Sequence, residues 1–178
     1  MTVNDCVKLA AVELGISEAL ESGEAAEKIL SLLVKCYNIV ENELALDYLP
    51  LTAEDEVETA TGTVEFSVLK ENAVRICKVA DESGEAVKFK LFPTYLKTQP
   101  GKLKIWYTYT PQEKVADDKC ECALGVSARM IAYGVAAEYC LCMSLYEESA
   151  VWDKKYKGAI EAVYKATPSK RIQSRRWL

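Results

Sequence analysis

Four of the seven cysteines form two closely spaced pairs, and these are the residues whose type and spacing could most readily do chemistry. They are Cys120 with Cys122 in "CEC" and Cys140 with Cys142 in "CLC". Four thiolates are a common ligand set for zinc. Both pairs lie in or beside a helical pattern, however, where residues two apart point about 200° apart, and metal-binding cysteines usually have two to four residues between them. We therefore favour reduced thiols that pack as small hydrophobic side chains, with a cysteine metal site as the alternative.

Histidine is missing from the sequence, which removes the most common general base near neutral pH and the imidazole metal ligands. Ser-His-Asp and Cys-His nucleophiles are excluded with it. The adjacent acids Asp117-Asp118 and Glu147-Glu148 do not face each other on a helix or a strand, so solvated charge is the simpler interpretation. The glycines form no phosphate-binding motif. We predict a protein that is not an enzyme and has no cofactor, with a small carboxylate-dependent enzyme as the weakest alternative.

Charge and hydropathy exclude further classes. The net charge of −5 argues against broad nucleic-acid binding, which needs a basic face. The most apolar stretch, Cys120–Tyr146, is interrupted by Arg129 and Glu138, so a membrane span is not expected. The opening "MTVNDCVKLAAVELG" lacks the basic-then-apolar order of a signal peptide. These features predict a soluble protein that is made in the cytoplasm and does not bind a membrane.

Hydrophobic periodicity predicts helices on both sides of a strand-rich middle region. Apolar residues recur at helical spacing in four segments, 3–14, 24–46, 121–146 and 148–165. Between residues 51 and 111 the period drops to two, as in "TGTVEFSVL" and "KLKIWYTYTP". The pattern predicts an α+β fold with one domain, 1–168. This domain would be mainly an antiparallel bundle of about four helices, with a small antiparallel β-sheet inserted at 51–111.

Three residues stand out against these patterns as candidate subunit contacts. Trp106 lies on the polar face of its predicted strand, where it is either covered by a helix or marks a contact surface. Arg129 and Glu138 lie nine residues apart in an otherwise apolar segment, too far for a pair on neighbouring turns, so each is expected to reach solvent or a partner subunit. Because the helix that contains them is apolar on nearly every side, we expect it to be buried in a core or between subunits.

The last ten residues, "SKRIQSRRWL", form a basic arm, 169–178, after Pro168. The segment contains no acid, and its four cations are Lys170, Arg171, Arg175 and Arg176. Aromatic and arginine side chains dominate protein docking sites, so an arm that also carries Trp177 is suited to an acidic, apolar groove on a partner. The alternative is a solvated terminus without a docking role.

Three stretches carry a resemblance to a known family: "LLVKCYNIVENELALDYLPL" (Leu32–Leu51), "GKLKIWYTYTP" (Gly101–Pro111) and "YGVAAEYCLCMSLYEESAVWDKKYKGAI" (Tyr133–Ile160). Together with the basic ending, they resemble the head–tail connector proteins of tailed bacteriophages, which are also called adaptors or head-completion proteins. The likeness covers most of the chain in family order, and its motifs are structural. A similar helical frame with a β insertion also occurs among tail tubular proteins of short-tailed phages.

The resemblance implies a structural protein of the virion neck that is encoded by a bacteriophage or prophage and assembled in the bacterial host cytoplasm. Its partners would be the portal protein and a stopper or tail-completion protein. It would oligomerise into a ring of the portal's twelve-fold order. The ring would surround a channel through which double-stranded DNA passes during packaging without sequence-specific binding. An acidic body suits such a channel because it repels phosphates, and the basic arm would then dock on the portal. Another phage neck or tail-tube protein is the alternative.

Overall fold

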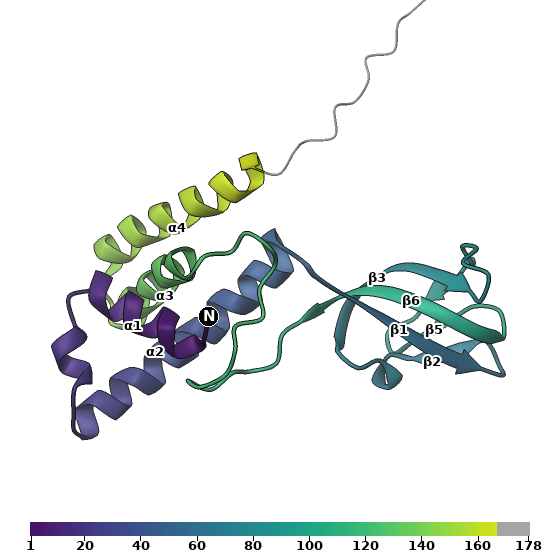
Figure 1. Ribbon diagram of the computed structural model, residues 1–178, viewed down its shortest axis with the longest axis horizontal. Coiled ribbons are helices and arrows are strands. Elements are labelled where there is room, and N and C mark those ends of the chain that lie inside the picture. Colours follow the sequence, from purple (N-terminus) through teal and green to yellow (C-terminus); the bar gives the residue numbers. More distant parts are fainter. Residues whose placement is uncertain (167–178) are drawn as a thin grey trace, which may run out of the picture. The chain divides into compact units, whose positions relative to one another are not determined.

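The computed structural model describes residues 1–166, with side chains up to residue 164, and Figure 1 shows its elements. These residues form two compact units. The strand unit comprises Met1–Val3 and Asn38–Leu124, and the helical unit comprises Asn4–Tyr37 and the chain from Gly125 onward. Within residues 1–166 there are four α-helices and two three-stranded antiparallel sheets.

The helices α1 (Val3–Glu13) and α2 (Glu24–Glu43) form where apolar residues recur at helical spacing. The buried side of α1 consists of Val3, Cys6, Val7, Ala10 and Ala11. The chain leaves α1 through Gly15, whose φ of +72° favours glycine. A short 3₁₀ helix, η1 (Ser17–Leu20), then leads to α2, which buries Leu33, Cys36, Tyr37 and Val40.

The helices α3 (Ala128–Cys142) and α4 (Tyr146–Ala166) contact each other along their length and lie side by side in Figure 1. The hydroxyl of Ser127 caps the start of α3 by accepting a hydrogen bond from the Met130 N–H at 3.2 Å. Nine of the 15 residues of α3 are buried. Of the two environments expected for this apolar helix, the structure therefore shows burial inside its own chain.

The strand unit contains two sheets. The first has the order β1-β6-β3, and its strands are β1 (Leu51–Thr59), β6 (Gly101–Thr110) and β3 (Asn72–Asp81). The second has the order β2-β5-β4, and its strands are β2 (Thr63–Glu65), β5 (Tyr95–Lys97) and β4 (Lys90–Leu91). All pairs are antiparallel. A 3₁₀ turn, η3 (Phe66–Val68), follows β2.

Both sheets contribute to one hydrophobic core. It consists of Val64, Leu69, Ile76, Val79, Leu96, Leu103, Ile105 and Tyr107. The alternation predicted for "KLKIWYTYTP" is confirmed, because Leu103, Ile105 and Tyr107 are buried while Lys102 is exposed and Trp106 is half-buried. The inward-facing residues alternate with polar ones along β1 and β6, whereas register shifts interrupt the alternation in β3.

The α+β character of the prediction is confirmed, but its main architecture, a helical bundle with one small inserted sheet, is wrong. The strands form two sheets that enclose a core of their own, so they bury their apolar faces against each other. In addition, α2 does not belong wholly to the helices, since its residues from Asn38 onward are part of the strand unit. The helices therefore flank an independent sheet structure.

The predicted helix 121–146 is also too long. Residues 121–127 are not helical and contain a turn at Leu124 and Gly125, and the preceding segment is held to the N-terminus by the hydrogen bond from the Val3 N–H to the Asp118 carbonyl at 3.0 Å. Gly125, with a φ of +96°, precedes the Ser127 cap, and only then does α3 begin. The predicted helix 24–46 is shorter as an α-helix, because α2 ends at Glu43 and a π-helical turn, Leu44–Tyr48, follows. The other two helices end within two residues of their predicted bounds.

Candidate functional site

One face of the sheet β1-β6-β3 carries charged side chains around Trp106. The burial pattern of β1 places Glu54, Glu56 and Glu58 on the exposed face, because Leu51, Asp55 and Thr59 point inward. In the antiparallel register, Glu54 lies opposite Trp106 of β6. The alternation of β1 therefore places three carboxylates on one face of the sheet, and the register places Glu54 beside the aromatic residue that we predicted as a subunit contact.

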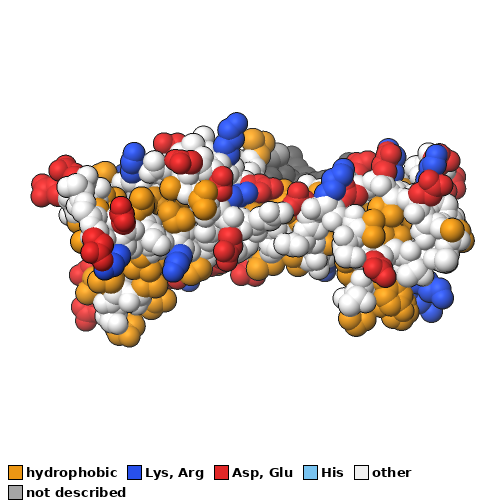
Figure 2. All heavy atoms as spheres, turned by 90° about the horizontal axis from the view of Figure 1, so that it is seen from below, with side chains coloured by type: hydrophobic (Ala, Val, Ile, Leu, Met, Phe, Trp, Pro, Cys, Tyr) orange, Lys and Arg blue, Asp and Glu red, His pale blue; other side chains and the backbone are white. Residues whose placement is uncertain are grey.

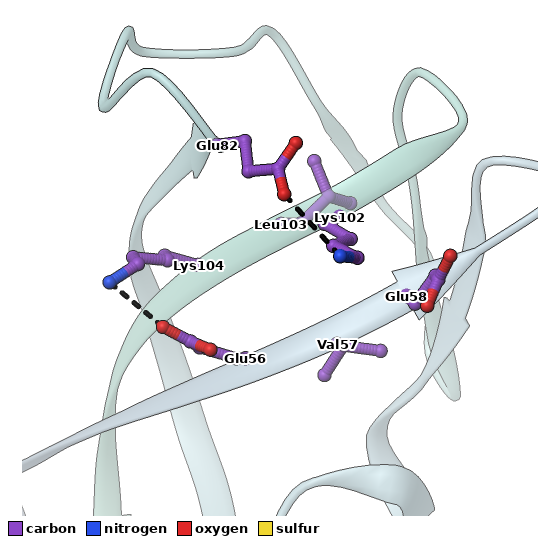
Figure 3. A pocket seen from close by; sticks show the side chains of 7 residues that line it. All are labelled: Glu56, Val57, Glu58, Glu82, Lys102, Leu103 and Lys104. Atoms are coloured by element: carbon purple, nitrogen blue, oxygen red, sulfur yellow. Dashed lines mark ion pairs between the residues drawn. The ribbon is translucent and has the colours of Figure 1, made fainter.

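The carboxylates are matched by lysines on β6, as Figure 3 shows. The Lys104 ammonium lies 2.8 Å from a Glu56 carboxylate oxygen and 3.7 Å from one of Glu54. The Lys102 ammonium lies 3.4 Å from Glu82. The hydrogen bond between Lys104 and Glu56 raises the pKa of the lysine and lowers the pKa of the carboxyl group. An open hollow of about 430 Å³ is lined by side chains of both charges, among them Glu56, Glu82, Lys102 and Lys104.

Trp106 is half-buried, and a lysine rather than a helix covers it. The Lys78 ammonium lies 4.8 Å from the centroid of the Trp106 ring, which is cation–π distance, and Lys78 is the cross-strand neighbour of Trp106 on β3. An aromatic ring that is surrounded by charged side chains is a typical centre of a protein contact. The role of Trp106 as a subunit contact stays a prediction.

Arg129 and Glu138, the other predicted contacts, belong to α3 of the helical unit, whereas Trp106 belongs to the strand unit. Arg129 is engaged within its own chain, because its guanidinium nitrogen lies 3.3 Å from Glu13 and its centre 5.7 Å from the Tyr133 ring. Glu138 is half-buried, and burial raises the pKa of its carboxyl group, with a further rise from the nearby charge of Asp153. The structure therefore does not gather the three predicted residues into one site.

The four paired cysteines differ in their surroundings. Cys140 is buried, Cys142 is exposed, and Cys120 and Cys122 are intermediate. The Cys122 thiol donates to a Glu41 carboxylate oxygen at 3.9 Å. Within residues 1–166, no three side chains among His, Cys, Asp and Glu lie close enough to hold a metal ion. No observation in the described part of the chain therefore favours the cysteine metal site.

Buried Cys36 has a perturbed thiol. Burial, and secondly the neighbouring thiol of Cys142, raise the pKa of Cys36 to about 12. A thiol with such a pKa stays protonated near neutral pH and is a poor nucleophile. This cysteine fits the packing role that the sequence suggested for the thiols.

The sequence interpretation missed a buried polar pair below the sheet face. The carboxylate of Asp55, which is only 4% exposed, accepts a hydrogen bond from the Tyr107 hydroxyl at 2.7 Å and from the Lys70 N–H at 2.8 Å. The Lys70 ammonium lies 3.1 Å from the same carboxylate. The position of Asp55 on the inward face of the alternating strand β1 could have indicated a buried carboxylate. Its partners could not be predicted, because Tyr107 is 52 residues away.

These contacts change the acidity of both side chains. Burial by itself would raise the pKa of Asp55, but the hydrogen bonds from Lys70 and Tyr107 outweigh it and lower that pKa. Burial, followed by the hydrogen bond to Asp55, raises the pKa of Tyr107 to about 12. Asp55 is therefore ionised and Tyr107 neutral near neutral pH. The pair anchors the segment before β3 to the sheet.

A second missed cluster joins the end of α2 to the segment after β6. The Asn38 amide exchanges two hydrogen bonds with the backbone of Lys114, at 2.8 and 3.0 Å. Glu121 accepts from the Tyr109 hydroxyl at 2.6 Å and from the Lys114 ammonium at 2.8 Å, and these two bonds lower its pKa. Buried Glu41 accepts from the Glu121 N–H at 2.7 Å. These groups fix the chain between β6 and α3, which is a structural role.

No protein-family model matches the sequence, and no curated protein is significantly similar to it. Within the described residues, none of the helices has the length and apolar character needed to cross a membrane. The basic arm, with Lys170, Arg171, Arg175, Arg176 and Trp177, lies outside the described residues, so its predicted docking role stays a prediction.

Proposed function

We propose that the protein is a structural protein of a phage virion, a head–tail connector that docks on the portal ring and assembles into a ring around the DNA channel. In this role it acts in the virion neck, with the portal and a stopper or tail-completion protein as partners, and it performs no catalysis. The observation that carries the proposal is the resemblance of Leu32–Leu51, Gly101–Pro111 and Tyr133–Ile160 to connector proteins.

The positions of these stretches support a structural interpretation of the resemblance. The first covers the second half of α2 and the π-helical turn, the second covers β6, and the third covers most of α3 and α4. They form cores and central strands. The Trp106 face adds support, because an aromatic side chain among charged neighbours suits contact with another protein.

The first test is assembly on purified portal rings, measured by sedimentation velocity and by electron microscopy of the complexes. We expect the wild-type protein to bind portal rings and form a ring there. Trp106→Ala should weaken this assembly at least tenfold, as is typical of a central aromatic contact, whereas Thr108→Ala, on the same face of β6, should have little effect. A wild-type protein that never binds portal rings would contradict the connector proposal.

The second test addresses the arm. Deletion of Ser169–Leu178 should remove portal binding and leave thermal unfolding nearly unchanged. Trp177→Ala should weaken binding more than any single lysine or arginine change, and binding should weaken as salt rises because salt screens exposed charges. Equal binding by full-length, truncated and Trp177→Ala proteins at low and high salt would show that the arm has no docking role.

A further inference from the structure

The strand unit has a surface that is both apolar and basic, which we call the basic hollow. Two adjacent hollows share Phe92, and the apolar side chains around them include Phe66, Val74, Leu91 and Phe92. Leu91 is 54% and Val74 53% exposed, which is high for aliphatic residues that lie next to each other. The charged residues that line the two hollows are all cations, namely Arg75, Lys88, Lys90 and Lys97.

The cations of the basic hollow are not neutralised within residues 1–166. None of the four forms an ion pair there, although lysines elsewhere on the strands do. Lys90 and Lys97 are direct cross-strand neighbours on β4 and β5, an arrangement in which like charges repel. The Phe92 ring is held in place by stacking on Tyr95, with centroids 4.6 Å apart. A binding partner with negative charges would relieve the repulsion and cover the apolar side chains.

The helical unit has a second apolar surface, which we call the helical groove. It lies along α1, η1 and α2, and its lining residues are Asn4, Lys8, Ala11, Val12, Ser17, Leu20, Glu21 and Leu30. Val12 is 62% exposed. The chain from Glu13 to Glu27 contains five acids and no base. Glu13 pairs with Arg129 and Glu24 with Lys28, but Glu18, Glu21 and Glu27 form no ion pair within residues 1–166.

These acids lie close to the groove. Glu21 lines it, Glu18 follows the lining residue Ser17 directly, and Glu27 is three residues before Leu30, which makes the two neighbours on the surface of α2. The groove thus combines exposed aliphatic side chains with one lining carboxylate, Glu21, and one lining cation, Lys8, while Glu18 and Glu27 flank lining residues, so acids outnumber bases around it. Figure 2 shows hydrophobic side chains at the surface over both units. The chain therefore carries two exposed apolar surfaces, one lined by cations and no acid, the other with more acids than bases around it.

We propose that the basic hollow of one copy docks on the helical groove of a second copy. The apolar side chains of the hollow would pack on Val12, Leu20 and Leu30, and the lysines would face the unpaired glutamates. Because the two surfaces differ, the contact is head-to-tail, and repeated contacts of this kind generate rings or filaments. The inference rests on the proposed function in one respect, since it identifies the surfaces for the self-association that a connector ring requires.

A charge-swap experiment tests the contact. One variant carries Lys88→Glu, Lys90→Glu and Lys97→Glu, and the other carries Glu18→Lys, Glu21→Lys and Glu27→Lys. Self-association is measured by sedimentation velocity over a concentration series, at low and high salt and with portal rings as template. Each variant alone should associate at least tenfold more weakly than wild type, because like charges then meet at the contact. An equimolar mixture should recover association, because every contact between unlike copies again joins opposite charges.

The recovery in the mixture separates a true contact from misfolding, which mixing cannot repair. A control variant, Glu147→Lys with Lys154→Glu, changes exposed charges on α4 and should associate like wild type. The proposal would be overturned if each triple variant on its own associated like wild type, or if the mixture of the two variants did not recover self-association. A wild-type protein that stays monomeric at all concentrations with and without portal rings would overturn it as well.

Two further measurements distinguish this inference from the proposed function. Portal binding by each triple variant, measured without the other, tests the connector role separately. If a variant still binds portal rings and its self-association is unchanged, the proposed docking surfaces are wrong and the connector role is not affected. Binding of double-stranded DNA is measured in parallel. If the Lys→Glu variant loses DNA binding while its self-association is unchanged, the basic hollow is a nucleic-acid contact and the proposed copy-to-copy contact is wrong.

Discussion

In the strand unit a buried carboxylate, Asp55, accepts hydrogen bonds from Tyr107 and Lys70, whereas the helical unit buries the thiols of Cys6, Cys36 and Cys140 among apolar side chains. The three buried polar or charged residues of the described chain, Glu41, Asp55 and Thr59, all belong to the strand unit. The strand unit thus buries polar and charged side chains, and the helical unit relies more on close packing. The difference predicts that the two units respond to different perturbations.

The pKa values of the carboxyl groups also differ between the two units. Four carboxyls of the strand unit have lowered pKa values, namely those of Asp55, Glu56, Asp81 and Glu121. In the helical unit, burial raises the pKa of Glu138. Hydrogen bonds in the first unit favour ionised carboxylates, whereas desolvation in the second favours the neutral acid. These directions predict that the stabilities of the two units change with pH in opposite directions.

The largest effect is expected for the packing of the helical unit. Ile131→Ala removes a fully buried side chain of α3 and should lower the free energy of opening of α3 and α4 by about 4 kcal/mol. Native-state hydrogen exchange measures this opening segment by segment. Leu141→Ala, at an exposed position of the same helix, is the matched control and should cost much less. An equal loss of hydrogen-exchange protection in β6 would show that both units open together and would contradict the difference between them.

The next largest effect is expected for the polar pair of the strand unit. Asp55→Ala leaves the Tyr107 hydroxyl and the Lys70 N–H without their acceptor and should lower the free energy of opening of β1 and β6 by about 3 kcal/mol. Tyr107→Phe removes two hydrogen bonds, the one donated to Asp55 and the one accepted from the Glu71 N–H at 3.3 Å, and should cost about 2 kcal/mol. The exposed neighbour Glu56 provides the control as Glu56→Ala. Hydrogen exchange in which α3 loses as much protection as β6 would contradict a local role for the pair.

A smaller effect is expected for the thiols. Cys140→Ser places a hydroxyl in an apolar site and should destabilise the protein by about 2 kcal/mol, whereas Cys140→Ala should cost about 1 kcal/mol. Cys142→Ser, at an exposed position, should have almost no effect. Urea unfolding measures the three variants. Stoichiometric zinc or iron in the wild-type protein purified under reducing conditions would contradict the packing role and restore the metal-site alternative.

The smallest effect is expected for pH. Because the folded pKa of Asp55 is lowered, its ionised form contributes stability that is present above its unfolded pKa of about 4 and is lost as pH falls through the folded pKa. Glu138 has the opposite sign, because its folded pKa is raised: the cost of burying its charge is relieved as pH falls from neutral toward its unfolded pKa of about 4.

Hydrogen exchange at several pH values, corrected for the intrinsic rates, measures this difference. Between neutral pH and about pH 5, α3 should gain protection slightly, and below about pH 4 β6 should lose protection first. Glu138→Gln should remove the gain in α3, and Asp55→Asn should reduce the pH dependence of β6. Parallel changes of both segments at every pH would show that the units do not titrate separately.

The sequence by itself determined the elements whose periodicity is local. The period of two in "KLKIWYTYTP" correctly predicted β6, whose buried residues include Leu103, Ile105 and Tyr107, and the helical spacing over 3–14 correctly predicted α1, which buries Val3 and Val7. A period of two or of 3.6 residues is a property of neighbouring positions, so it can be read from a single sequence. The same alternation placed Trp106 on the polar face of its strand.

Only the tertiary structure decided how these elements combine. That the strands form two sheets with their own core depends on pairings such as Glu54 with Trp106, which are 52 residues apart. The same holds for the Asp55–Tyr107 hydrogen bond and for the isolated antiparallel bridge between Thr2 and Lys119, which holds the segment before α3 to the N-terminus. Such contacts are selected by the free energy of the whole folded chain, in which long-range pairing overrides local propensity, and periodicity contains no information about them.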